Sequence, residues 1–179
     1  MEKIKYRRQL PEFMKELGLP MVSAEIGVAE GYFSADLLAG GMDKHYLIDI
    51  WKTENVQGDG ASDQEWHDKN YRAAMFRVKK FGDRAIVLKG FSEAMSIHVP
   101  DNSLGLVYLD GGHSYADVYM DLTVWIHKAV SGAIIAGHDY LNKSYGVMRA
   151  VQDFTNGKYK VHVIPEDKDE DAGFFFLNK

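Results

Sequence analysis

The chain has 179 residues, carries a net charge of −5 and contains no cysteine, while 46% of its residues are apolar. This length fits one domain over residues 1–179, and the negative charge argues against a nucleic-acid partner, because phosphate contacts need clustered lysine and arginine. The lack of cysteine excludes disulfides, cysteine nucleophiles and cysteine-based zinc or iron–sulfur sites.

The first half of the chain alternates helical and extended patterns. Apolar residues recur at helical spacing in the opening segment, and Gly18 and Pro20 predict where that helix ends. Ser62, followed by Glu65, has the pattern of a capping box and predicts the start of a later helix. The expected helices are residues 3–17, 32–38, 62–80 and 92–97, and the expected strands are residues 21–26, 46–51 and 85–88.

The second half continues this alternation and then changes. Its expected helices are residues 115–130 and 145–154, and its expected strands are residues 104–109, 133–136, 160–164 and 174–177. We expect Gly132 to cap the first of these helices. The acidic turn at 166–171 is too short for a crossover helix, so the last two strands should form an antiparallel hairpin.

These elements predict an α/β fold with a Rossmann-like, doubly wound sheet. The sheet should be mostly parallel, with helices on both faces, a C-terminal antiparallel hairpin, and an N-terminal helix within residues 1–20 packed on the core. No apolar run approaches the ~20 residues of a membrane helix, and none follows the N-terminal charges as in a signal peptide. We therefore expect a cytoplasmic protein without a membrane partner.

The loop after the first expected strand carries the pattern Glu25-x-Gly27-x-x-x-Gly31-x-x-Ser34. Two glycines four residues apart let the backbone turn sharply and let a ligand approach it closely. A dinucleotide fingerprint would need a third glycine at position 25, where this chain has glutamate. Asp49 comes near the end of the second expected strand, where nucleoside-binding α/β folds place an acidic residue on the ribose hydroxyls.

Polar residues also follow the later strands. Asp110 and His113 come after the fourth expected strand, and His138 and Asp139 come after the fifth. Ligands bind outside the carboxyl ends of the strands in open parallel sheets, so we expect these side chains to share one site with the glycine loop.

The pattern from Glu25 to Ser34, together with Asp49, resembles the cofactor site of class I S-adenosylmethionine-dependent methyltransferases. The order of elements resembles that fold over nearly the whole chain. The resemblance implies that S-adenosyl-L-methionine is the cofactor, that Gly27 and Gly31 make room for its methionine part, and that Asp49 holds its ribose. The implied cofactor-binding residues are Glu25, Gly27, Gly31, Tyr32, Ser34, Asp49 and Asp110, with Ile50, Trp51, Phe91 and Ser92 around the adenine.

The motifs at 110–113 and 137–140 resemble a bacterial group of metal-dependent O-methyltransferases that includes enzymes acting on antibiotic sugars. The resemblance implies methylation of a hydroxyl on a small, sugar-like acceptor, with His113 as general base and Asp110 as a further catalytic residue. Asp110 and Asp139 would bind Mg²⁺. This chain has His138 where that group commonly has a carboxylate, and a metal set of Asp110, His138 and Asp139 suits Mn²⁺ better. Whether a metal is bound stays open.

Three alternatives also stay open. An NAD-dependent oxidoreductase of Rossmann type is disfavoured by Glu25, a non-catalytic S-adenosylmethionine-binding module would keep the fold and the cofactor, and a metal-using hydrolase or hydroxylase would use the Asp110 to Asp139 cluster. The acceptor pocket must come from loops such as 140–145, from the N-terminal helix or from a second copy of the chain, so a homo-oligomer is compatible with the sequence. Residues 51–61 form either a lid or an ordinary loop, and His45 receives no role.

Overall fold

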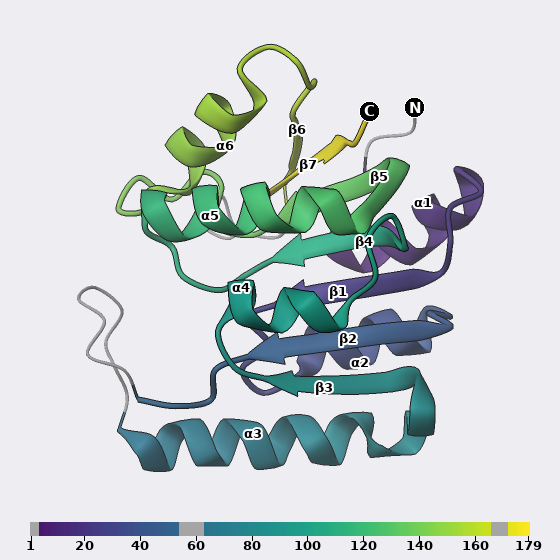
Figure 1. The fold of residues 1–179 in the computed structure, drawn as a ribbon, viewed down its shortest axis with the longest axis vertical. Coiled ribbons are helices and arrows are strands. Elements are labelled where there is room, and N and C mark those ends of the chain that lie inside the picture. The colour runs from purple at the N-terminus through teal and green to yellow at the C-terminus, as the bar shows by residue number, and fades with distance from the viewer. Residues whose placement is uncertain (1–3, 54–62, 166–171) are drawn as a thin grey trace.

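The computed structural model describes residues 4–53, 63–165 and 172–179. Within these ranges, one seven-stranded sheet lies between two layers of helices (Figure 1). The helices are α1 (Leu10–Glu16), α2 (Tyr32–Ala39), α3 (Gln64–Val78), α4 (Ser92–Met95), α5 (Tyr115–Trp125) and α6 (Val147–Thr155). The strands are β1 (Val22–Ile26), β2 (Lys44–Asp49), β3 (Ala85–Lys89), β4 (Leu104–Leu109), β5 (Ala129–Gly137), β6 (His162–Ile164) and β7 (Gly173–Leu177).

The strand order is β3-β2-β1-β4-β5-β7-β6. Strands β1 to β5 are parallel, and β7 runs antiparallel to both β5 and β6. This arrangement confirms the predicted doubly wound, mostly parallel sheet with its antiparallel C-terminal hairpin. The chain moves outward in opposite directions from β1 and β4, so the loops after these two neighbouring strands meet at a topological switch point.

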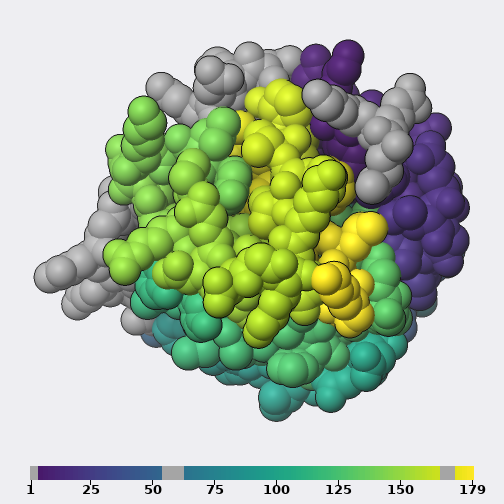
Figure 2. Space-filling model, turned by 90° about the horizontal axis from the view of Figure 1, so that it is seen from above, coloured from purple at the N-terminus to yellow at the C-terminus, as the bar shows by residue number. Residues whose placement is uncertain are grey.

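Each face of the sheet has its own hydrophobic core. Helices α1, α2 and α3 cover one face, where Leu10, Leu37 and Ala74 are fully buried. Helices α4, α5 and α6 cover the other face, which Figure 1 shows in front of the strands. At the β6 edge of the sheet, Figure 2 shows that α6, β6 and β7 form the surface, with the N-terminal segment beside them.

The N-terminal helix begins later than predicted. A 3₁₀ turn at Arg7–Gln9 leads into α1, and residues 4–6 are not helical. The side-chain oxygen of Gln9 accepts hydrogen bonds from the backbone N–H groups of Lys5 and Tyr6, at 2.8 and 3.0 Å. These bonds pair the backbone donors of residues 5 and 6 just before the 3₁₀ turn, where the chain is not helical.

The cap of α3 also differs from the prediction. Asp63 is the N-cap, and its carboxylate accepts a hydrogen bond from the backbone N–H of Trp66 at 3.0 Å. Glu65 therefore lies at the second helical position and cannot complete a capping box that starts at Ser62. The helix ends at Val78 rather than Lys80, and a 3₁₀ turn at Lys79–Arg84 follows it.

Strand β5 starts four residues earlier than predicted, and α5 is correspondingly shorter. Gly132 lies inside this strand, with a φ of +84°, rather than at a helix end. The side-chain amide of Asn178 donates to the carbonyls of Ala129 and Val130, and the backbone of Gly132 donates to that of Asn178. The C-terminal segment thus holds residues 129–132 within β5, through contacts that local sequence does not encode.

Two predicted segments lie wholly or mostly outside the described residues. These are the loop at 52–61, of which the structure describes 52–53, and the acidic turn at 166–171. None of the helices in the described ranges combines the length and the apolarity that a membrane crossing requires.

Candidate functional site

The glycines of the loop after β1 are required by packing. Gly27 has a φ of +86°, and a Cβ atom there would lie 2.1 Å from the backbone oxygen of Asp110. Gly31 has a φ of +75°, and its Cβ would lie 3.0 Å from Ala74 of α3. The pattern Gly27-x-x-x-Gly31 therefore lets the loop pass closely between the end of β4 and α3.

Asp49 organises this loop from the end of β2. One oxygen of its carboxylate accepts hydrogen bonds from the backbone N–H groups of Val28 and Ala29, at 2.9 and 2.8 Å, and the other accepts one from Trp51 at 2.7 Å. The strand predicted over 46–51 ends at Asp49, because Trp51 turns into the left-handed region with a φ of +39°. The carboxylate thus holds the loop in place, and its binding to ribose stays a prediction.

Trp51 lies under the glycine loop. Its side chain is fully buried, and its indole N–H donates to the carbonyl of Ala29 at 2.9 Å. The residue therefore supports the loop backbone, and its predicted contact with adenine is untested.

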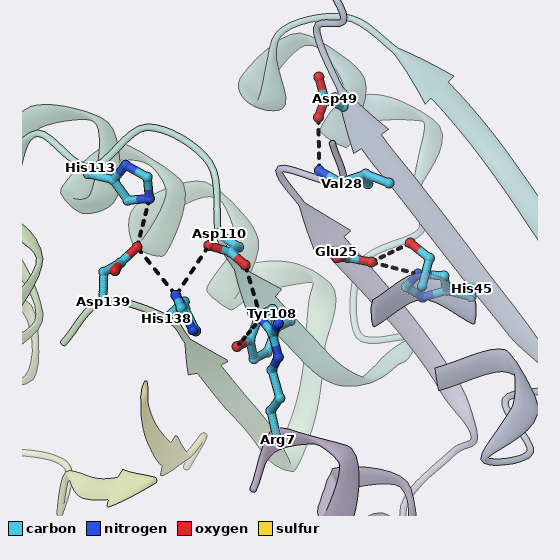
Figure 3. Close-up of polar contacts among 11 residues, drawn as sticks. Arg7, Glu25, Val28, His45, Asp49, Tyr108, Asp110, His113, His138 and Asp139 are labelled. Carbon is cyan, nitrogen blue, oxygen red and sulfur yellow. Dashed lines mark hydrogen bonds and ion pairs between the residues drawn. The ribbon is translucent and has the colours of Figure 1, made fainter. Parts of the chain in front are cut away.

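A buried polar cluster lies beside the loop, in the core. Glu25 accepts hydrogen bonds from Ser34 and His45, and Figure 3 shows Glu25 facing His45. His45 also bonds Ser23 at 2.8 Å. All four side chains are buried, and burial raises the pKa of the Glu25 carboxyl. His45, which received no role from the sequence, is therefore a buried core residue of β2. The predicted contacts of Glu25 and Ser34 with the cofactor stay predictions.

Four predicted residues come together at the ends of β4 and β5 (Figure 3). His113 Nε2 lies 3.0 Å from Asp139 Oδ2, and His138 Nδ1 lies 3.3 Å from the same oxygen. His138 Nδ1 also lies 3.8 Å from Asp110 Oδ1. The sequence prediction that Asp110, His113, His138 and Asp139 share one site is consistent with these distances.

The electrostatics of this cluster favour the ionised form of the Asp139 carboxylate. Burial alone raises the pKa of Asp139, but hydrogen bonds from His113 and His138 outweigh burial and bring that pKa well below its usual value. Burial lowers the pKa of His138, but the hydrogen bond to Asp139 and the charge of Asp110 raise it above the ordinary value. The cluster therefore pairs the anionic Asp139 carboxylate with two imidazoles, and Asp139 adopts a left-handed φ of +55°.

The donor set of the cluster fits a divalent cation. Among the described residues, Asp110, His113 and Asp139 each offer a ligand atom within 4.8 Å of the others. Two carboxylates with one imidazole suit Mn²⁺ better than Mg²⁺, which prefers oxygen ligands. This group contains His113, whereas the sequence prediction used His138 as the nitrogen ligand.

The loop after β3 carries Phe91 and Ser92, which were predicted to lie around the adenine of the cofactor. Phe91 is exposed, and Ser92 donates a hydrogen bond to Asp121 of α5. The indole N–H of Trp125 donates to the Ser92 hydroxyl at 2.7 Å. Burial raises the pKa of Asp121 to about 7, against the lowering effect of the Ser92 hydrogen bond. Ile50 is half-buried at the end of β2.

Sequence reasoning missed an anchor between the glycine loop and α3. Arg77 donates to the carbonyl of Glu30 at 2.8 Å, and its guanidinium carbon lies 3.6 Å from the ring centre of Tyr32. Tyr32 itself is largely exposed. An isolated arginine on a helix gives no sequence signal for such a contact.

Two further residues reach the cluster of Asp110 and His113. Arg7 Nη1 lies 3.2 Å from Asp110 Oδ2 (Figure 3), and the ring of Tyr145 stacks on His113 with centres 4.5 Å apart. Tyr145 belongs to the 140–145 segment that was expected to line the acceptor pocket. Arg7 gave no signal, since it belongs to a run of basic residues at the N-terminus.

Comparisons with known proteins agree with the fold. A family model described as a methyltransferase domain matches residues 24–140. No curated protein matches the chain. The O-methyltransferase NovP is a structural neighbour with a TM-score of 0.71 and 18% identity, over 96% of this chain and 77% of NovP.

Two further neighbours were solved with a cofactor or its product. An O-methyltransferase from Bacillus cereus in complex with SAH gives a TM-score of 0.68 at 11% identity, over 98% of this chain and 83% of that one. TomG from Streptomyces achromogenes, an O-methyltransferase of tomaymycin synthesis in complex with SAM, gives 0.68 at 13% identity, over 97% and 79%. The family match spans more than half of the chain, and the chain belongs to the methyltransferase domain family, with the fold of class I S-adenosylmethionine-dependent methyltransferases.

Proposed function

We propose that this protein transfers the methyl group of S-adenosylmethionine to a hydroxyl oxygen of a small, sugar-like acceptor, with His113 as the general base. The observation that carries the proposal is the 3.0 Å contact between His113 Nε2 and Asp139 at the sheet edge that also holds the glycine loop. The O-methyltransferase neighbours support the choice of oxygen as the methylated atom.

A hydrogen bond from Nε2 to Asp139 would keep the imidazole proton on Nε2 and leave the lone pair on Nδ1 of His113. Nδ1 would take the proton of the acceptor hydroxyl as the oxygen attacks the methyl carbon. The new oxygen–carbon bond forms while the carbon–sulfur bond breaks, and the sulfur keeps the electron pair of that bond. Asp139 would stabilise the imidazolium that results, as a carboxylate beside a histidine base does in hydrolases.

A divalent cation, Mn²⁺ or Mg²⁺, would be held by the carboxylates of Asp110 and Asp139 together with one imidazole. When bound, it would lower the pKa of the acceptor hydroxyl. If His113 were that ligand, it could not accept the proton, so we assign the nitrogen ligand to His138, which lies within 3.8 Å of both carboxylates.

The cofactor site would combine the glycine loop with the residues after β2 and β3. Positioning of the methyl group against the acceptor hydroxyl would supply much of the rate, because the positive sulfur already activates the methyl carbon. We propose that a second copy of the chain is one source of acceptor-pocket residues. We propose no nucleic-acid partner.

Two measurements test this function. Calorimetric titration with SAH and with NAD identifies the cofactor, and tight binding of NAD without a response to SAH would contradict the proposal. Transfer of a labelled methyl group from S-adenosylmethionine to a panel of hydroxylated acceptors then tests the reaction.

The general base is tested by the variant His113→Ala, with His98→Ala as the matched control. His98 is exposed at the end of the 3₁₀ turn Ser96–His98, away from the cluster. We expect H113A to lose about 10²- to 10⁴-fold in kcat, the usual contribution of general-base catalysis, while SAH affinity is unchanged. Equal rates for H113A and the wild type would remove the base role, and SAH binding without transfer to any acceptor would indicate a non-catalytic binding module.

A further inference from the structure

The guanidinium of Arg7 packs against two aromatic rings from distant parts of the chain. The guanidinium carbon lies 4.9 Å from the ring centre of Phe33 in α2 and 5.9 Å from that of Tyr108 in β4. These two rings pack against each other with centres 4.4 Å apart. Aromatic faces attract cations, so this pair holds the guanidinium at the end of β4.

The polar contacts of Arg7 point into the catalytic cluster. Its Nη1 lies 3.2 Å from Asp110 Oδ2 and 3.4 Å from the hydroxyl of Tyr108. The other oxygen of Asp110 faces Nδ1 of His138 at 3.8 Å. Each oxygen of this carboxylate therefore faces a nitrogen of the chain itself, and Figure 3 shows Arg7 and His138 on the two sides of Asp110.

A guanidinium and a metal ion that contact the same carboxylate weaken each other's binding through the repulsion of their positive charges. Arginine keeps its positive charge at all ordinary pH values. As long as Arg7 contacts Asp110, it therefore offsets the negative charge of that carboxylate. A divalent cation bound to Asp110 would lie a few ångströms from the guanidinium, and like charges at that distance repel even near the protein surface. The side chains of Arg7 and Asp110 are 32% and 24% exposed, so solvent screens this repulsion only in part.

We propose that Arg7 is a built-in counter-ion that competes with a divalent cation for Asp110, so that the segment before α1 sets the metal affinity of the site. This inference rests on the metal site of the proposed function, but it concerns binding and does not depend on the methyl acceptor. Arg7 then determines, at a given metal concentration, whether Asp110 is paired with the guanidinium or with a divalent ion.

The experiment measures Mn²⁺ affinity by electron paramagnetic resonance of the free ion, with calorimetry as a second readout. The test variant is Arg7→Gln, and the matched control is Arg8→Gln, which removes a neighbouring charge that stacks on Tyr6 outside the cluster. We expect R7Q to bind Mn²⁺ about five- to fifty-fold more tightly than the wild type, because removal of a part-screened charge is felt at this scale. R8Q should change the affinity by less than about two-fold.

Two further variants make the result specific. Arg7→Lys keeps the charge and should keep Mn²⁺ affinity within about three-fold of the wild type. Asp110→Asn in the R7Q background should abolish the gained affinity, because the amide that replaces the carboxylate offers no charge to the ion.

Several outcomes would overturn the inference. Equal Mn²⁺ affinity in R7Q and the wild type would do so, as would an affinity gain that survives Asp110→Asn, or no Mn²⁺ binding by any variant. Failure of the wild type to bind SAH would instead reject the proposed function, and the Mn²⁺ titration would still report on Arg7.

Discussion

At the scale of single residues, the described part of the chain holds several side chains whose chemistry follows from burial. Asp121 is 7% exposed, and its pKa is raised to about 7 mainly because burial penalises the charged carboxylate. Ser92 and Trp125 hydrogen-bond around it, so the carboxyl lies in a fixed network and has little access to water.

The raised pKa of Asp121 predicts a pH-dependent stability. The folded state holds a proton that the unfolded state has already released above about pH 4, so the free energy of unfolding should fall as pH rises from about 4 to about 7 and then level off. At about 1.4 kcal/mol for each pKa unit, the loss is roughly 4 kcal/mol. Urea unfolding at a series of pH values measures it.

The matched variant for this residue is Asp121→Asn, which still accepts the Ser92 hydrogen bond through its amide oxygen. We expect D121N to lose this component of the pH dependence and to be more stable than the wild type at pH 8. Parallel stability curves for the two proteins between pH 4 and pH 8 would contradict the prediction.

Gly27 supplies a second prediction at this scale. In Gly27→Ala, the new methyl group would overlap the backbone of Asp110 and would also need a left-handed φ. We expect unfolding free energy to fall by about 3 kcal/mol or more and SAH affinity to fall at least about ten-fold. Gly18→Ala is the control, because Gly18 also has positive φ but has open space around it, and should cost only about 1–2 kcal/mol without changing SAH affinity.

At the scale of elements, the glycine loop is held from two sides. Asp49 binds its backbone from β2, and Arg77 binds the carbonyl of Glu30 from α3. The sequence singled out Asp49, because an acidic residue at the end of a second strand is a recognisable pattern, but it predicted a contact with ribose and not this anchor. It gave no signal for Arg77, because that contact joins residues 47 positions apart with no motif.

Arg77 should therefore act as a positioning residue for cofactor binding. We expect Arg77→Ala to weaken SAH binding about three- to ten-fold, because the loop must then be ordered when the ligand binds. Arg72→Ala is the matched control on the exposed side of the same helix. Calorimetry should show a less favourable binding entropy for R77A. Unchanged SAH affinity would mean that Asp49 alone keeps the loop in place.

Features that depend on contacts between neighbouring residues could be predicted from the sequence, whereas features that depend on contacts between distant residues could not. Strand β4 was predicted with its observed bounds, since six buried apolar residues define it locally. The predicted start of β5 was wrong because Asn178, near the other end of the chain, holds residues 129–132 within the strand by hydrogen bonds. The approach of Arg7 to Asp110 spans 103 positions, and only the packing of α2 and β4 creates it.

At the scale of the whole molecule, strands β4 and β5 separate the glycine loop from the C-terminal hairpin. The glycine loop and Asp49 lie at β1 and β2, whereas β7 and β6 form the opposite edge, three and more strands away. Phe176 of β7 is fully buried there and packs against Phe154 and Tyr159. The hairpin thus contributes core volume to a domain whose cofactor residues lie elsewhere.

This separation predicts that stability and cofactor affinity can be changed independently. We expect Phe176→Ala to lower the free energy of unfolding by about 3–5 kcal/mol, the usual cost of removing a buried phenylalanine, while the folded protein keeps its SAH affinity. Phe76→Ala is the control, because Phe76 is 82% exposed on α3 and should change stability by less than about 0.5 kcal/mol. Urea unfolding and SAH calorimetry at a temperature where the variant stays folded measure both quantities. If F176A lost SAH affinity as well, the hairpin and the cofactor site would form one coupled unit across the sheet.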